Sequence, residues 1–451
     1  MTRTLRSCTA LLAALLGTAT TQAQWEVVGT QQFSSGWARH TVIDFAPDNT
    51  PYVAYGDVGL QEKAVVRRFF NGAWQVVGTE GFSAGTALDI SLDISADGVP
   101  YVAYRDMANG QKATVMAYQG GSWQTVGQAG LSEGQAMKTC LAIAPDGTPY
   151  ISYLDGAHEN KVTTRRFANG SWTTLGAEGF SPYFASSVSM TFDGNGVVYT
   201  GYAGTSGCRV ERFVNGAWEL LGVESSFYNA RTASLAIGSD HTVYMAYLDG
   251  SNDMGGSMKK YVNGTWEQVG QVAFTNEDAS MDYYTMALDD NDVPYVAYKD
   301  SHAGQKATVQ RFVNDAWELV GPMSFTPNWS DFVSLAIDQD NVPYVVFSDA
   351  TDFTFKSTAM RFAEGSAAVD EPHPGDAFTF RADADRMCVK LINAPVGALV
   401  SLMDMAGKVV GEHRVADPGA AISTAHLKAG LYLLRLDHQG RTRSGKVAVV
   451  R

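Results

Sequence analysis

The sequence predicts an all-β protein, a seven-bladed β-propeller closed by an N-terminal strand and followed by a small C-terminal β-sandwich. A tryptophan recurs at positions 25, 74, 123, 172, 218, 266 and 317, in steps of 46 to 51 residues. A segment like PYVAY recurs in step with it, at positions 51, 100, 149, 198, 243, 294 and 343. This period is typical of a propeller blade. The third observation is that the first and last copies of the repeat are incomplete.

Each repeat is predicted to contain four short strands. In the second copy they are ISLDI (90–94), PYVAY (100–104), KATVMAY (112–118) and WQTVG (123–127). Asp97-Gly98 and Gly120-Gly121 are two-residue hairpin turns between them. PYVAY is apolar on both faces, as expected for a sheet packed between two others. We therefore expect the recurrent tryptophan to pack between blades.

The incomplete ends favour a closed ring over an open β-solenoid, which is the alternative fold. A helical solenoid is excluded because the apolar residues show no 3.6-residue period. In complete copies a segment such as RFFNG, at Arg68, stands just before the recurrent tryptophan. The first tryptophan segment, Trp25 to Gly29, has no such segment before it. The last such segment, RFAEG at Arg361, has no tryptophan after it. If the first strand completes the last blade, the ring has no exposed sheet edges. This offset resembles the closure of WD40-type propellers, although the WD dipeptide is absent.

Domain boundaries follow from changes in composition. Residues 1–23 are predicted to be a signal peptide, with Arg3 and Arg6 before a short apolar core and Ala23 at the cleavage site. Residues 24–364 form the propeller, 365–377 a polar linker and 378–451 the C-terminal domain. No later segment is long and apolar enough to span a membrane. The net charge of −14 argues against a nucleic-acid partner.

The C-terminal residues carry a second set of patterns. They are VSLMDMAGKVV (400–410), ISTAHLKAGLYLLRLDHQG (422–440) and GKVAVVR (445–451). Together they resemble the type A C-terminal sorting domain of type IX secretion cargo in Bacteroidota. The positions that match are Asp404, Gly407, Lys408, Leu427, Gly430, Tyr432 and Lys446. A PNP sequence usual near the family's first strand is replaced by EPHPGD. The resemblance implies the type IX secretion machinery as a partner and a secreted, extracellular or outer-membrane surface location.

Candidate ligand residues lie in the loops that lead from one repeat to the next, where the copies differ most. Alternate connections of a propeller emerge on one face, so these loops share a face around the axis. Aromatic side chains next to Arg and His suit carbohydrate or peptide binding. We therefore expect a glycan or protein ligand. The candidate residues are Trp37, Arg39, His40, Tyr183, Phe184, Tyr228, Arg231, Tyr283 and Trp329.

The alternative function is a polysaccharide-degrading enzyme, a glycosidase or lyase, with carboxylates in the axial funnel. Asp89, Asp282 and Asp331 precede the first strand in three repeats and are the candidates. No serine elbow, HExxH motif or phosphate-binding loop is present, so a non-catalytic binding protein is favoured and no cofactor is expected. The turns 289–292 and 338–341 are predicted to be hairpins rather than calcium sites, so no metal is expected.

One repeated pair of charges is predicted to be structural. An aspartate and a lysine lie six residues apart in four repeats, as in Asp57 and Lys63. We expect such pairs to bridge the ends of a loop. Cys140, Cys208 and Cys388 are far apart and are predicted to be unpaired buried residues rather than a disulfide framework.

Overall fold

The structure is a computed structural model. It describes residues 24–204, 207–223, 227, 229–275 and 279–363 and, in the C-terminal part, 379–383, 388–392, 396–403, 408–417, 420–424, 427–428, 430–438 and 441–449. Residues 23–364 form one compact unit, and the C-terminal residues belong to a second. The predicted signal peptide and linker lie outside the described residues. The described chain is all-β, and no described helix is long and apolar enough to cross a membrane.

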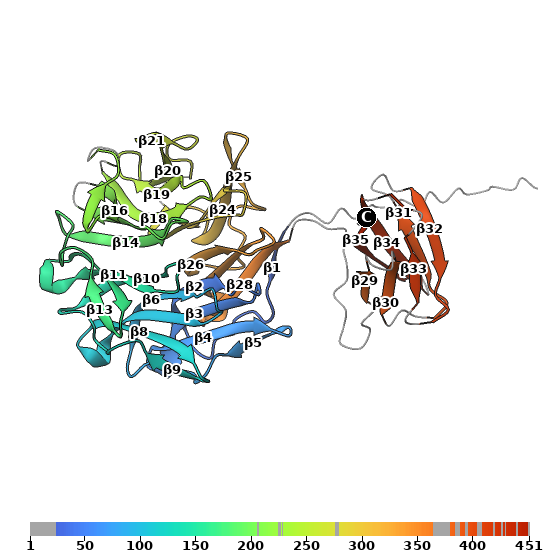
Figure 1. Ribbon diagram of the computed structural model, residues 1–451, viewed down its shortest axis with the longest axis horizontal. Coiled ribbons are helices and arrows are strands. Elements are labelled where there is room, and N and C mark those ends of the chain that lie inside the picture. The colour runs from blue at the N-terminus through green and yellow to red at the C-terminus, as the bar shows by residue number, and fades with distance from the viewer. Residues whose placement is uncertain are drawn as a thin grey trace, which may run out of the picture. The chain divides into compact units, whose positions relative to one another are not determined.

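The first unit consists of four-stranded antiparallel sheets, seven of them among the described residues. The innermost strands, gathered in the middle of the unit in Figure 1, are β2 (Ala38–Phe45), β6 (Ala87–Ile94), β10 (Ala136–Ile143), β14 (Ala185–Phe192), β18 (Ala230–Ile237), β22 (Ala279–Leu288) and β26 (Ser330–Ile337). The second strands are β3 (Pro51–Asp57), β7 (Pro100–Asp106), β11 (Pro149–Asp155), β15 (Val198–Gly204), β19 (Val243–Asp249), β23 (Pro294–Asp300) and β27 (Pro343–Asp349).

The outer half of each sheet follows the same order. The third strands are β4 (Lys63–Phe70), β8 (Lys112–Gln119), β12 (Lys161–Ala168), β16 (Gly207–Val214), β20 (Gly255–Val262), β24 (Lys306–Val313) and β28 (Lys356–Ala363). The outermost strands are β5 (Ala73–Val76), β9 (Ser122–Thr125), β13 (Ser171–Thr174), β17 (Ala217–Leu220), β21 (Thr265–Gln268), β25 (Ala316–Leu319) and, for the last sheet, β1 (Gln24–Val27). Short 3-10 turns η1 (Val58–Leu60), η2 (Met107–Asn109), η3 (Gly156–His158) and η5 (Thr351–Phe353) follow the second strands of four sheets.

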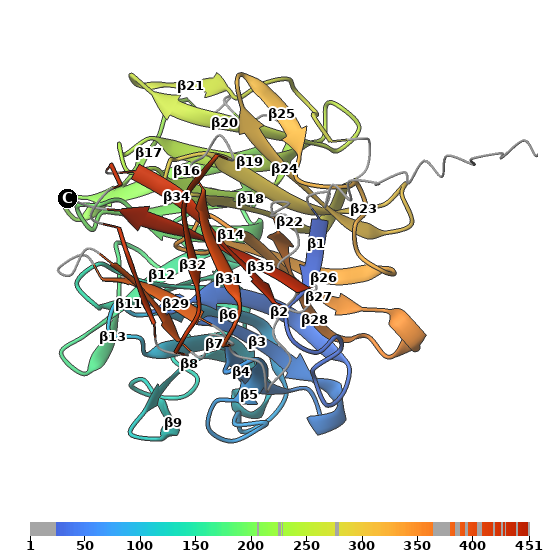
Figure 2. The same cartoon turned by 90° about the vertical axis from the view of Figure 1, so that its right-hand side faces the viewer.

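The sheets follow one another around a ring. Each innermost strand contacts the innermost strand of the next sheet, and β26 contacts β2. The strand β1 pairs with β28, with Trp25 opposite Phe362, so the first strand completes the last sheet as the incomplete repeats predicted. Both views show β1 lying beside β28 (Figures 1 and 2). The second strands β3, β23 and β27 are buried along their whole length, which is why their sequence is apolar on both faces.

The recurrent tryptophans join neighbouring sheets, which confirms that prediction. Each indole Nε1 donates a hydrogen bond to a backbone carbonyl of the preceding sheet or the turn after it; Trp25 bonds Val320 and Trp74 bonds Val28, both at 2.8 Å. In five sheets a phenylalanine from the loop before the next repeat lies flat on the indole, as Phe325 does on Trp25 with ring centroids 4.1 Å apart. The indole is therefore both an apolar filler and a hydrogen-bond donor between sheets.

The aspartate and lysine pairs have a structural role that differs from the one predicted. Asp57 lies opposite Lys63 where β3 and β4 meet. Its carboxylate accepts hydrogen bonds from the backbone amides of Gly59, at 2.9 Å, and Gly36, at 3.0 Å. The aspartate thus caps the turn and fixes the neighbouring loop through these two backbone amides. The predicted ion pair with lysine is not formed by the described residues.

The second unit contains two antiparallel sheets. One contains β29 (Thr379–Asp383), β30 (Cys388–Ile392) and β33 (Ala421–Ser423). The other contains β31 (Leu399–Met403), β32 (Val409–Arg414), β34 (Gly430–His438) and β35 (Arg441–Val449). One apolar cluster takes residues from both sheets, including Leu391, Ile422, Leu402 and Leu434. Asp404 and Gly407 of the sorting-domain pattern lie outside the described residues, as do the side chains of Lys446 and Cys388.

Candidate functional site: a ring mouth and an aromatic cluster

The innermost strands β2, β6, β10, β18 and β26 each contain a bulge near their start, and the first bulged residue differs from sheet to sheet. In β2, two residues, His40 and Thr41, stand opposite one residue of β3. The first bulged residue adopts a left-handed backbone, with φ of 55° at His40, 49° at Asp89 and 52° at Lys138. Such a conformation costs a residue other than glycine about 1 kcal/mol or more. The same strained backbone thus recurs in several sheets and carries a different side chain in each. Bulges of this kind often direct side chains toward a binding site.

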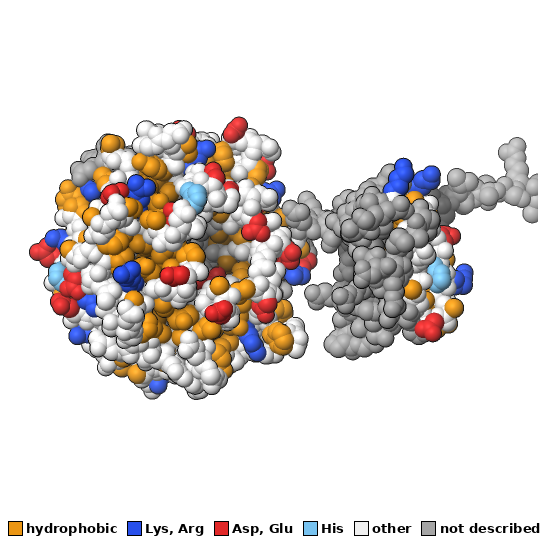
Figure 3. Space-filling view, viewed as in Figure 1, with side chains coloured by type: hydrophobic (Ala, Val, Ile, Leu, Met, Phe, Trp, Pro, Cys, Tyr) orange, Lys and Arg blue, Asp and Glu red, His pale blue; other side chains and the backbone are white. Residues whose placement is uncertain are grey.

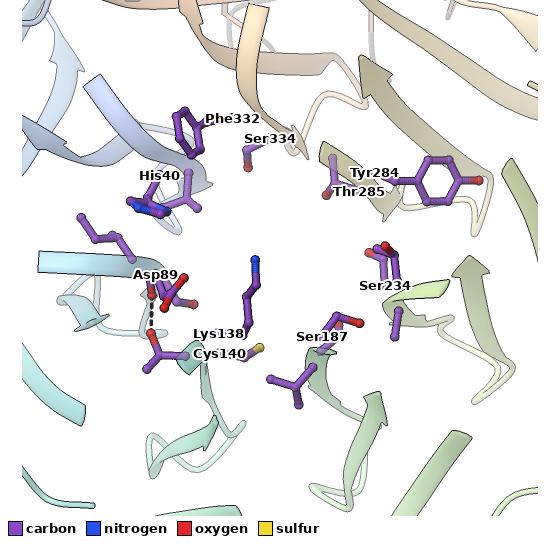
Figure 4. Close-up of a pocket in the computed structure, with 18 of the residues that line it drawn as sticks. His40, Asp89, Lys138, Cys140, Ser187, Ser234, Tyr284, Thr285, Phe332 and Ser334 are labelled. Atoms are coloured by element: carbon purple, nitrogen blue, oxygen red, sulfur yellow. Dashed lines mark hydrogen bonds between the residues drawn. The ribbon is translucent and has the colours of Figure 1, made fainter. Parts of the chain in front are cut away.

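These bulges surround a cavity of about 470 Å³ at the mouth of the ring. Pockets of this size hold small ligands or one end of a larger one. Residues from the innermost strands of all seven sheets line it. Figure 4 shows Lys138 reaching toward the middle of the ring and the Tyr284 ring pointing away from it.

Several lining hydroxyls hold the ring together rather than face a ligand. The Ser91 Oγ accepts a hydrogen bond from the backbone amide of Leu141 at 3.0 Å. Ser189 and Ser234 accept from the amides of the next sheet in the same way, both at 3.1 Å. The hydroxyls of Thr41 and Thr139 donate to the carbonyls of the bulged residues Phe332 and Asp89 of the preceding sheets. Chemical variety at the mouth therefore comes from the bulged residues themselves.

Burial, more than the neighbouring charges, determines the protonation state of His40. Burial lowers the pKa of its imidazole to about 4, and nearby Asp89 opposes this effect, while the cations Arg39, Lys138 and Arg105 add to it. His40 is therefore a neutral imidazole at neutral pH, able to donate one hydrogen bond and accept another. Asp89 lies 3.2 Å from the Arg105 guanidinium, measured from Oδ2 to Nε. The mouth combines a neutral imidazole with an ion pair.

A cluster of three aromatic rings lies beside this mouth, where the last sheet meets the first. We call Trp37, Trp329 and Phe355 the aromatic cluster. The Phe355 ring centroid is 5.2 Å from that of Trp37 and 5.7 Å from that of Trp329. The two indoles remain 38% and 39% exposed although they pack on Phe355. Large aromatic side chains held rigid and left accessible are typical of ligand contacts.

Backbone hydrogen bonds fix the cluster in place. The Phe355 carbonyl accepts from the Ala38 amide at 2.9 Å, and the Trp329 carbonyl accepts from the Ala350 amide at 3.0 Å. The loop that supplies Phe355 is longer than its counterparts, because Lys356 comes seven positions after Asp349, whereas the lysine comes six positions after the aspartate in the four predicted pairs. Phe355 itself has a left-handed φ of 52°. A bulky residue in that conformation is strained, and strain of this kind occurs most often at functional sites.

Charged groups border the cluster and join it to the mouth. Lys299 Nζ pairs with Asp331 Oδ1 at 2.8 Å, and Trp329 Nε1 donates to the same oxygen at 3.1 Å. On the other side the Arg39 guanidinium lies 5.4 Å from the Trp37 ring and 6.0 Å from the Phe332 ring. Phe332 is also 5.0 Å from the His40 imidazole. Arg39 and Phe332 therefore connect the aromatic cluster to the cavity, which Phe332 and His40 line.

The structure brings some of the predicted ligand residues together and leaves others apart. Trp37, Arg39, His40 and Trp329 form the surface just described, and Arg231 lines the cavity from the far side. Tyr183 and Phe184 are exposed but do not line it. Tyr228 and the side chain of Tyr283 lie outside the described residues.

The three carboxylates of the enzyme hypothesis have different surroundings. Asp89 lines the cavity, whereas Asp331 lies beside the aromatic cluster, where it contacts Lys299 and Trp329. The side chain of Asp282 lies outside the described residues. Among the described candidates, then, the structure does not place two carboxylates in the cavity.

Phe355 is the residue that sequence reasoning missed. It belongs to the loop between the second and third strands, whereas the predicted ligand residues lie in the loops between repeats. The extra residue between Asp349 and Lys356 was the available signal. On the face of the first unit shown in Figure 3, acidic and basic side chains are scattered among apolar patches.

No protein-family model matches the chain, and no curated protein matches it in sequence. Solved structures do match. The extracellular domain of the putative hybrid two-component system BT4673 from B. thetaiotaomicron aligns with 96% of this chain and 60% of its own length, at 9% identity and a TM-score of 0.50. PorZ, a surface component of the type IX secretion system of Porphyromonas gingivalis, aligns over 91% and 59%, at 14% identity and 0.45. The Aleuria aurantia lectin, described as a six-bladed β-propeller that recognises fucose, aligns over 66% and 99%, at 16% identity and 0.45.

These likenesses concern the fold. At 9% identity the BT4673 domain is a relative in architecture only, and the scores of the other two are lower still. The repeated four-stranded sheets arranged in a ring define a β-propeller repeat protein. The function has to be argued from the site of this chain.

Proposed function

We propose that the protein is a secreted or cell-surface seven-bladed β-propeller that binds glycans without cleaving them. The observation that carries this proposal is the aromatic cluster, in which Trp37 and Trp329 stay exposed while Phe355 holds them in place. The apolar face of a pyranose ring stacks on an indole, and its hydroxyls need polar partners at the ring edge. Asp331 with Lys299 and Arg39 with Glu62 supply such partners beside the two indoles.

The adjoining cavity gives the same surface a place for one end of a chain. Its volume of about 470 Å³ is enough for one or two sugar units. The neutral imidazole of His40 and the carboxylate of Asp89 offer both donors and acceptors to hydroxyl groups. The fucose recognition described for the Aleuria lectin belongs to that protein; for this chain we propose only the class of ligand.

The proposal is tested by screening the purified full-length protein against a glycan array and measuring the affinity of each hit by calorimetry. Replacing Trp37 or Trp329 with alanine should weaken binding about tenfold each, since ~1.4 kcal/mol is comparable to one aromatic contact. Phe70→Ala is the matched control. Phe70 is 44% exposed, with Arg68 over its ring, but it lies at the far end of β4.

The outcomes separate the candidate functions. Equal affinity in the tryptophan variants and the wild type would refute the assigned site. If no glycan on the array binds, and a protein ligand is captured whose binding is lost in the same tryptophan variants, the surface recognises protein. Release of reducing ends or unsaturated products that is lost in Asp89→Asn would establish the polysaccharide-degrading alternative.

We also propose that residues 378–451 are a sorting β-sandwich that directs export through the type IX secretion machinery. Support comes from the resemblance at Lys408, Leu427 and Tyr432. Leu427 is buried in the apolar cluster, and the Tyr432 hydroxyl donates to the Lys428 carbonyl at 3.0 Å. In a bacterium with this pathway, the full-length protein should reach the cell surface or the medium. A chain ending at residue 377 should stay in the periplasm, and equal export of both would reject the proposal.

A further inference from the structure

The sheet β10–β13 carries a group of side chains outside the proposed glycan site. Glu133 comes from the connection between β9 and β10, His158 from η3, and Glu178 from the connection between β13 and β14. One potential ligand atom from each lies within 4.8 Å of the others. From this juxtaposition we propose that Glu133, His158 and Glu178 bind a divalent transition-metal ion, with Zn²⁺ the best match to one imidazole and two carboxylates.

The orientation of the imidazole supports the proposal independently of the acidic groups. Asp155, which is fully buried, faces His158 Nδ1 through Oδ2 at 3.2 Å. The other ring nitrogen, Nε2, then points at Glu178, 3.9 Å from Oε2. Histidine ligands of metals are typically held in this way, with one ring nitrogen on a carboxylate and the other free for the ion.

The distances are close to those of a formed site. Zn–N and Zn–O bonds of about 2.1 Å in a tetrahedron place two ligand atoms about 3.4 Å apart. The separation of 3.9 Å between His158 Nε2 and Glu178 Oε2 would therefore close by about half an ångström. Glu133 is exposed, so its side chain can rotate to complete the set, and water would fill the fourth position.

The remaining oxygen of Glu178 is already engaged, which leaves one oxygen for the ion. Glu178 Oε1 accepts hydrogen bonds from Arg165 and, at 3.1 Å, from the Thr174 hydroxyl. Arg165 offers one positive charge against the three carboxylates of Glu133, Glu178 and Asp155. A divalent cation would offset the excess of two carboxylates.

The two preceding repeats lack this group. The equivalent positions, 49 and 98 residues earlier, are Ala84, Asn109 and Ala129 in the second repeat and Ser35, Leu60 and Glu80 in the first. Asn109 donates to Asp106 at 2.7 Å just as His158 faces Asp155, so the frame is the same but the ligands are absent there. Sequence spacing could not reveal the site, because its members lie 25 and 20 residues apart.

The experiment is calorimetric titration of the EDTA-treated full-length protein with ZnCl₂. The wild type should bind one equivalent at this site, and His158→Asn should weaken that binding at least tenfold. This variant reproduces Asn109 and keeps a donor for Asp155, so its unfolding without metal should match the wild type. Glu178→Gln should also weaken binding.

The matched control is His241→Asn. His241 also has a carboxylate near Nδ1, with Asp193 Oδ2 at 3.9 Å, but the described residues place no second acid within ion-pairing distance of it. Zinc binding should be unchanged in this variant. Undiminished zinc binding in His158→Asn, equal loss in His241→Asn, or no binding by the wild type would each overturn the proposal.

Discussion

Replacing Asp44 with asparagine should stabilise the propeller at neutral pH and have little effect at pH 4. Asp44 and Asp93 occupy equivalent positions of β2 and β6, where the other repeats have alanine or threonine. Asp44 accepts from the Ile94 amide at 2.8 Å, and Asp93 accepts from the Ile143 amide at 2.7 Å. Burial raises the pKa of Asp44 from 3.8 to about 6, and burial together with the Asp44 charge raises that of Asp93.

The sign follows from proton linkage. A carboxyl group with a raised pKa in the folded state binds its proton more tightly there than in the unfolded chain. Its contribution to stability is therefore complete below pH 3.8 and is lost as the pH rises through about 6. The difference between those pKa values corresponds to at most about 3 kcal/mol at pH 7.5. Asparagine stays neutral and can still accept the Ile94 amide, so Asp44→Asn should recover part of that free energy.

The assay is urea unfolding of wild type and variant at pH 4.5 and pH 7.5, followed by tryptophan fluorescence. All nine tryptophans lie between residues 25 and 329, so the signal reports the propeller alone. Asp48→Asn is the control, because hydrogen bonds from Thr50 lower the pKa of this exposed carboxyl group. A stability difference between Asp44→Asn and wild type that is the same at both pH values would refute the reasoning, as would destabilisation that grows with pH.

Three further predictions concern the framework. Trp25→Ala should lower the free energy of unfolding, measured in urea, by about 3–5 kcal/mol. The loss should be at least as large as in Trp172→Ala, because Trp25 also anchors the closing strand. A smaller loss in Trp25→Ala than in Trp172→Ala would contradict this prediction. Asp57→Ala should cost about 2–3 kcal/mol because two backbone amides lose their acceptor, whereas Lys63→Ala should change stability by less than about 1 kcal/mol in the same assay. Burial raises the pKa of the Cys208 thiol, so iodoacetamide at pH 8 should alkylate Cys208 only when urea unfolds the protein. Peptide mapping measures the alkylation. Alkylated Cys208 in the native protein would disprove the burial of this thiol.

The repeat made most of the propeller predictable. Trp25 and the residues around Phe362 could be assigned to one sheet because two half-repeats complement each other. The packing role of the tryptophans followed from their period. The partners of Asp57 did not, since a sequence shows opposite charges but not the backbone amides that a turn presents.

The candidate site could be predicted only in part, because ligand contacts come from loops whose paths the repeat does not determine. Trp37, Arg39, His40 and Trp329 were found by their divergence between copies. Phe355 was missed because a single extra residue in a short loop turns it toward the two indoles. The distances that assemble Glu133, His158 and Glu178 likewise depend on three separate connections.

The pairing of β1 with β28 has a consequence for how the protein reaches its folded state. The earliest strand of the propeller to be synthesised has its partner more than 330 residues further along the chain. Until Lys356 to Ala363 emerges, Gln24 to Val27 has no sheet to join, and the ring stays open with two bare edges. A growing or translocating chain can therefore form its middle sheets early, but it becomes a ring only when the last of them is complete.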